Sequence, residues 1–69
     1  MRKVIQHKET WLFLDATGGW IQEPERATTF GSITEAVNFC LERGIKRDVQ
    51  LVLLMGNLSF PIDVFPSDY

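Results

Sequence analysis

The pattern of hydrophobic and polar residues is clearest between Ser32 and Gly44, where it predicts one amphipathic helix. Apolar residues recur there at intervals of three and four, the spacing that places side chains on one helical face. This apolar stripe consists of Ile33, Ala36, Val37, Cys40 and Leu41. We expect Ser32 to accept a hydrogen bond from the amide of Glu35, and Glu35 to reach back to the amide of Ser32, as in a capping box. Gly44 is the residue type that commonly ends a helix in the left-handed conformation.

A β-hairpin is predicted after the helix. Residues Val49–Met55 and Leu58–Val64 are rich in apolar side chains and are joined by Gly56-Asn57, a typical two-residue turn. One face of this hairpin pairs Met55 with Leu58, Leu53 with Phe60, Leu51 with Ile62 and Val49 with Val64. The other face pairs Leu54 with Ser59, Val52 with Pro61 and Gln50 with Asp63. Because proline has no amide N–H, we expect the second strand to lie at a sheet edge.

The first third of the chain predicts another hairpin. Thr10–Ala16 and Trp20–Glu23 flank the turn sequence Thr17-Gly18-Gly19. A two-residue loop places Ile21 on one face, together with Leu12, Leu14 and Ala16. It places Trp20 on the opposite face, together with Trp11 and Phe13. A loop of odd length reverses the positions of Trp20 and Ile21.

The order of these elements predicts an α+β fold, β-β-α-β-β. Lys3–His7 is either a strand of its own or the start of a longer strand bent near Lys8 and Glu9. We therefore expect an antiparallel sheet of four strands, or of five, with the helix on one face. The 69 residues are expected to form a single small domain.

Composition and charge argue against two classes of partner. The chain is 45% hydrophobic and 23% charged, as is typical of folded globular proteins. Its net charge of −2 argues against non-specific nucleic-acid binding, which relies on a basic surface. The longest apolar run, Leu51–Met55, is far shorter than the roughly 20 residues that cross a bilayer. The N-terminus lacks the apolar run of a signal peptide, and the single Cys40 fits a reducing compartment. We expect a cytoplasmic protein with no membrane partner.

No residue pattern predicts catalysis. His7 is the only histidine, and we expect it to be an exposed polar residue because no second ligand or base accompanies it. Cys40 lies within the apolar stripe, where burial raises the pKa of a thiol and makes it unreactive. Asp15 and Glu23 approach each other across the first hairpin, but no second feature indicates a cleft between them. We expect no enzymatic activity, no metal and no cofactor.

An excess of large apolar side chains is the feature that suggests a function. If the helix covers one face of the sheet, the residues on the opposite face remain exposed. An apolar patch of this kind usually marks an interaction site, and Trp is enriched at binding hot spots. The candidate partner-binding residues are Trp11, Phe13, Trp20, Val52, Leu54 and, outside the apolar stripe of the helix, Phe39. The alternative is that the N-terminal strand or residues Phe65–Tyr69 cover this face, and that Phe39 packs under those terminal residues.

We therefore interpret the chain as a protein–protein interaction module, such as a regulator, an inhibitor or an assembly subunit, and we expect a homodimer. The alternative from another class is a protein that binds single-stranded nucleic acid. In that case Arg2, Lys3 and Lys8 contact phosphates while Trp11 stacks on a base. Arg26, Lys46 and Arg47 add charge if they lie on the same side. The acidic balance of the chain makes nucleic acid the less expected partner.

Overall fold

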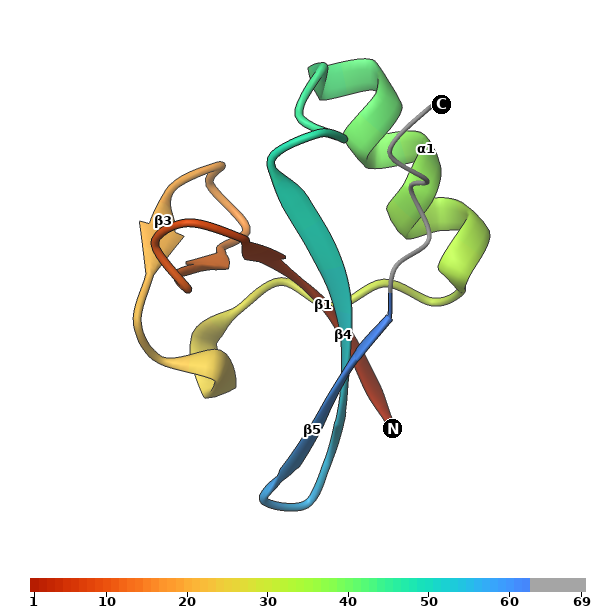
Figure 1. The fold of residues 1–69 in the computed structure, drawn as a ribbon. Helices are drawn as coiled ribbons and strands as arrows, with labels where there is room; N and C mark the ends of the chain where they lie inside the picture. Colours follow the sequence, from red (N-terminus) through yellow and green to blue (C-terminus); the bar gives the residue numbers. More distant parts are fainter. Residues whose placement is uncertain (63–69) are drawn as a thin grey trace.

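The computed structural model describes residues 1–62, which form one antiparallel sheet and one α-helix (Figure 1). The elements in chain order are β1 (Arg2–His7), β2 (Phe13–Leu14), β3 (Trp20–Ile21), the 3-10 helix η1 (Pro24–Arg26), α1 (Ile33–Arg43), β4 (Val49–Met55) and β5 (Leu58–Ile62). The order across the sheet is β3-β2-β1-β4-β5. This confirms the α+β class and decides the strand number, because β1 is a separate strand at the centre of the sheet.

The two ends of α1 are stabilised by the predicted residues, with one change of partner. The Ser32 hydroxyl accepts the amide of Glu35 at 3.1 Å, and Gly44 ends the helix in the left-handed conformation with a φ of 68°. The Glu35 carboxylate, however, accepts the amide of Gly31 at 3.0 Å, where the sequence predicted the amide of Ser32. The reciprocal bond of the cap therefore forms one residue further from the helix.

The buried face of α1 is narrower than the predicted apolar stripe. Ala36 and Cys40 are fully buried, whereas Ile33 and Leu41 at the two ends of the stripe are exposed. Phe39, outside the stripe, is half-buried and packs against the core. The helix is thus rotated about its axis toward Phe39, relative to the orientation that the sequence pattern predicts.

The hairpin of β4 and β5 has the predicted register. Met55 pairs with Leu58, Leu53 with Phe60, Leu51 with Ile62, Leu54 with Ser59 and Val52 with Pro61. The φ of Gly56 is 60°, which fits a type II′ turn with glycine at its first central position. β5 lies at the edge of the sheet, as Pro61 predicts. The expected pairs Val49–Val64 and Gln50–Asp63 lie outside the described residues.

The hairpin of β2 and β3 differs from the prediction. Phe13 pairs with Ile21 and Leu14 with Trp20, so residues 15–19 form a loop of odd length. Trp20 therefore shares a face with Leu14, and the predicted grouping of Trp20 with Trp11 and Phe13 is wrong. Hydrogen bonds to the Asp15 carboxylate explain the longer loop: Oδ1 accepts the amides of Thr17 at 2.9 Å and Gly19 at 2.8 Å.

The segment from Thr10 to Ala16 is less extended than predicted, because the chain turns between His7 and Trp11. The amide of Trp11 donates to the carbonyl of His7 at 3.0 Å, and Trp11 has a φ of 63°. The imidazole Nδ1 of His7 accepts the amide of Glu9 at 3.1 Å. Trp11 therefore lies in this turn and not in β2.

Two clusters of apolar side chains form the core, one on each face of the sheet. The helix-side cluster contains Ile5, Leu14, Cys40 and Val49, with Trp20, Phe30, Val37, Phe39 and Ile45 packed against it. The connector-side cluster contains Val4, Ala27 and Val52, with Phe13 and Leu54 packed against it. Sheet residues thus need cover on both faces, and α1 supplies cover on only one.

The connector between β3 and α1, residues 22–31, supplies the second cover. The amide of Thr28 donates to the carbonyl of Leu14, and the amide of Phe30 to the carbonyl of Lys3, both at 3.0 Å. These bonds hold Ala27 against the sheet, where it is buried with Val52. The sequence interpretation left this face open or assigned its cover to the chain ends, whereas the connector covers part of it.

Candidate functional site

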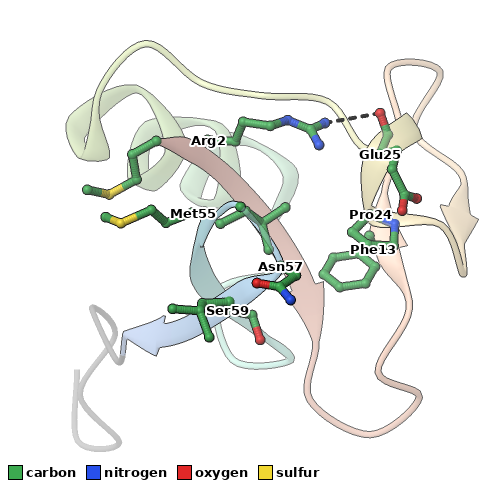
Figure 2. A pocket seen from close by; sticks show the side chains of 11 residues that line it. Arg2, Phe13, Pro24, Glu25, Met55, Asn57 and Ser59 are labelled. Carbon is green, nitrogen blue, oxygen red and sulfur yellow. Dashed lines mark hydrogen bonds between the residues drawn. The ribbon is translucent and has the colours of Figure 1, made fainter.

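A groove lies on the connector side of the sheet, between η1 and the β4–β5 hairpin (Figure 2). Its volume is about 490 Å³. Residues from β1, β2, η1 and the hairpin line it: Met1, Arg2, Phe13, Pro24, Glu25, Leu54, Met55, Gly56, Asn57, Leu58 and Ser59. Residues from the first part of the chain, up to Glu25, and from the distant β4–β5 hairpin therefore form this one concave surface.

Arg2 forms one wall of the groove and joins β1 to the connector. Its Nη2 donates to the carbonyl oxygens of Glu25 and Ala27, each at 3.2 Å. Figure 2 shows the side chain reaching from β1 across to η1. Arg2 also pairs with Leu54 of β4 in the sheet. The guanidinium therefore brings a positive charge to the groove and holds η1 beside it.

The remaining surface of the groove combines apolar side chains with the polar residues Glu25, Asn57 and Ser59. Phe13 and Leu54 pack against the connector-side cluster and remain partly exposed. In Figure 2 the Phe13 ring lies beside Pro24 at the end of the groove opposite the hairpin. Apolar side chains together with a few polar groups are typical of sites that bind a ligand or a side chain of a partner.

The end of the hairpin extends past the neighbouring strand and is exposed. Pairing between β1 and β4 stops at Arg2 and Leu54, so the Met55–Leu58 pair has no third strand beside it. The exposed fractions are 49% for Met55, 56% for Leu58 and 46% for Phe60. Met55 and Leu58 also line the groove, whereas Phe60 pairs with Leu53 on the helix-side face of the sheet. We call these three residues, together with the groove, the hairpin-end surface.

The structure brings together only part of the predicted set of binding residues. Phe13 and Leu54 both line the groove. Val52 lies on the same face but is only 2% exposed, because Ala27 of the connector packs over it. The other three predicted residues, Trp11, Trp20 and Phe39, do not line the groove.

Trp20 belongs to the core on the opposite side of the sheet. It packs against the helix-side cluster, and its indole meets the His7 ring edge to face, with 5.2 Å between the ring centres. His7 is half-buried by this contact, so the expectation that it is an exposed residue is wrong. A single aromatic face that includes Trp20 is therefore not present.

Trp11 and Phe39 lie in two further places. Trp11 is 63% exposed in the turn that follows β1, at the opposite end of that strand from Arg2. Phe39 packs against Phe30 with 5.4 Å between ring centres, and the Arg43 guanidinium lies 4.8 Å from the centre of its ring. The alternative cover expected for Phe39, residues 65–69, lies outside the described residues.

Sequence reasoning missed Met55, Leu58 and Phe60 as surface residues because it assigned the apolar face of the hairpin to the core. Comparing the length of the predicted helix with the length of the predicted strand could have indicated that they are exposed. The eleven residues of α1 span about 16 Å at 1.5 Å per residue. The seven residues of β4 span about 23 Å. A helix of this length cannot cover the whole apolar face of the hairpin.

Two titratable groups in the described residues, Cys40 and Asp15, have shifted pKa values. Burial raises the pKa of the Cys40 thiol to about 11, as the sequence predicted in direction. Hydrogen bonds from the Thr17 hydroxyl and the Gly19 amide lower the pKa of Asp15 below its ordinary value. Within residues 1–62, no three His, Cys, Asp or Glu side chains lie close enough together to hold a metal ion. The same residues contain no helix with the length and apolar character of a membrane span.

Comparisons with known proteins give no further indication. The chain matches no protein-family model, and no curated protein and no solved structure is significantly similar to it. We therefore base the function on the geometry of the hairpin-end surface.

Proposed function

We propose that this protein is a protein–protein interaction module that binds its partner through the hairpin-end surface. The observation that carries the proposal is the half-exposure of Met55, Leu58 and Phe60 on one protruding hairpin. Covering apolar surface contributes about 25 cal/mol per Å² of free energy, so three half-exposed apolar side chains on one hairpin favour association. A regulator, an inhibitor or an assembly subunit would all use such a surface.

The chemistry of the groove suits a segment of another protein. An apolar side chain of the partner would pack against Phe13 and Leu54, which are already held by the core. The positive charge of Arg2 at the wall would favour a partner carbonyl or carboxylate. The proposed role is binding and not catalysis. A cytoplasmic location is part of the proposal, and its support is the buried free thiol of Cys40.

Binding of single-stranded nucleic acid has less support from the geometry. Arg2 and Lys3 begin β1 on opposite faces of the sheet, and Lys8 and Trp11 follow its other end. The six residues of β1 separate these groups by about 17 Å. The four residues therefore do not form one groove in which basic side chains follow a backbone while an indole stacks on a base.

Site-specific photo-crosslinking in cells of the native host tests the proposal. A photoreactive amino acid replaces Leu58 in one variant and Glu42, an exposed residue of α1, in the matched control. We expect discrete crosslinked products at position 58 and none at position 42. The partner identified from these products should then bind the Leu58→Ser variant at least about tenfold more weakly, about 1.4 kcal/mol. Equal products at both positions, or none at either, would contradict the proposal.

A further inference from the structure

We propose that a second copy of this chain pairs along the free edge of β5, so that two sheets join into one antiparallel sheet. The inference rests on the proposed function, because β5 is part of the hairpin-end surface, and it names the second copy as a partner. The edge is open on the described part of the chain: β5 pairs only with β4, and Leu58, Ser59, Phe60 and Pro61 are all exposed. Figure 1 shows the hairpin of β4 and β5 extending away from α1.

The composition of β5 permits it to pair with a strand of another chain, whereas the composition of most edge strands prevents such pairing. Natural sheets usually protect an edge with charged side chains, bulges or a covering segment. The strand Leu58–Ile62 contains no charged residue. Pro61 is its one protective feature, since it removes a single N–H donor from the strand.

The register of the hairpin determines which backbone groups are free. A two-residue turn makes Met55 and Leu58 a hydrogen-bonded pair, and such pairs alternate along an antiparallel ladder. Phe60 and Leu58 therefore direct their backbone groups toward β4, while Ser59 and Pro61 direct theirs outward. The outward groups are the N–H and C=O of Ser59 and the C=O of Pro61.

These groups are complementary to those of a second copy related by a two-fold axis at Phe60. In that antiparallel arrangement Ser59 lies opposite Pro61 of the second copy, and its N–H donates to that carbonyl. Symmetry repeats the bond, so the pairing contains two such bonds. The side chains are compatible with this pairing as well. Phe60 lies beside Phe60 of the second copy, and Leu58 lies beside Ile62 of the second copy, so no like charges face each other.

The same geometry limits the assembly to two chains. Pairing through a two-fold axis uses the β5 edge of both copies, which closes the assembly. The other edge of the sheet, β3, has only two residues, and very short strands are poor templates for pairing. We therefore expect a dimer and not an extended fibre.

Two substitutions at one position test this dimer. Ser59→Pro removes the outward N–H donor, whereas the control Ser59→Ala keeps the backbone donor and removes only the exposed hydroxyl. We expect the wild type and Ser59→Ala to dimerise equally and Ser59→Pro to dimerise at least tenfold more weakly. Sedimentation equilibrium from about 10 μM to about 1 mM covers the affinities expected of a small interface. A monomeric wild type at the highest concentration, or equal dimerisation of all three, overturns the inference.

A measurement on the unmodified chain keeps the test independent of the folding of Ser59→Pro. The exchange rate of the Ser59 amide should fall with concentration in the wild type, because that amide becomes hydrogen-bonded in the dimer. An exchange rate that does not change with concentration overturns the inference. If the wild type is monomeric while position 58 still crosslinks to a different protein, only the dimer fails and the proposed function stands. If position 58 gives no crosslinked product, the proposed function fails as well.

Discussion

At the scale of single residues, the two tryptophans have different surroundings and different roles. The indole of Trp20 contacts the His7 ring and packs against the helix-side cluster. Trp11 is 63% exposed and lies in a turn with a positive φ. The first contributes to the stability of the fold, and the second is available to solvent.

Truncating each indole should separate these roles. We expect Trp20→Ala to lower the free energy of unfolding by about 2–3 kcal/mol, somewhat less than for a fully buried Trp. Trp11→Ala should change it by less than about 0.5 kcal/mol, as is usual for exposed positions. Urea denaturation followed by far-UV circular dichroism measures both values. Equal losses in the two variants would contradict the different packing of the two rings.

At the scale of elements, the β2–β3 hairpin depends on its loop. Each strand has only two residues, which is too few for a stable hairpin on its own. The Asp15 carboxylate compensates, since its Oδ1 accepts the Thr17 hydroxyl at 2.7 Å in addition to two backbone amides. Ionised acceptors make stronger hydrogen bonds than neutral ones.

This hairpin should therefore respond to pH through Asp15. The Thr17 hydroxyl and, next, the Gly19 amide lower the pKa of Asp15 in the folded protein. The ionised carboxylate stabilises the fold above the unfolded pKa of about 3.9, and this stabilisation is lost as the pH falls through the lower folded pKa. The difference in Tm between wild type and Asp15→Ala should be larger at pH 7 than at pH 2.5. Thermal denaturation at both values measures it, and a difference independent of pH would contradict the assignment.

At the scale of the whole molecule, the sheet is covered from two sides by segments of different kinds. α1 packs on one face, and the connector places Ala27 on the other, against Val4 and Val52. The bonds from Arg2 to the carbonyls of Glu25 and Ala27 hold the connector in place. The groove exists because this cover ends at η1, before it reaches the hairpin (Figure 2).

A charge introduced on the buried side of the connector should therefore destabilise the fold. Ala27 is 6% exposed, so the side chain in Ala27→Glu would be buried without a partner at a cost of at least about 2 kcal/mol. Thr29→Glu, at an exposed position of the same connector, is the matched control and should cost less than about 0.5 kcal/mol. Urea denaturation of both variants checks the difference. A tolerated Ala27→Glu would show that the connector does not cover this face.

The sequence predicted some residues of the candidate site and missed others, depending on whether their exposure is set by local or by distant contacts. Phe13 and Leu54 were expected at a binding surface and line the groove. Leu58 and Phe60 were assigned to the core, because their alternation with Ser59 and Pro61 fits a buried face as well as an exposed one. Their exposure depends on how far α1 extends along β4, which no local pattern encodes.

Sequence patterns were sufficient for the elements whose stabilising contacts lie within a few residues of each other. Ser32, Glu35 and Gly44 mark the ends of α1, and Gly56-Asn57 sets the register of β4 and β5, because capping and two-residue turns are local interactions. Only the three-dimensional structure decided on which face of the sheet Trp20 lies. That position follows from hydrogen bonds that lengthen the Asp15 loop by an odd number of residues. Only the structure showed what covers Val52, because the connector that packs there has no periodic pattern. Its contacts join residues that are distant in the chain.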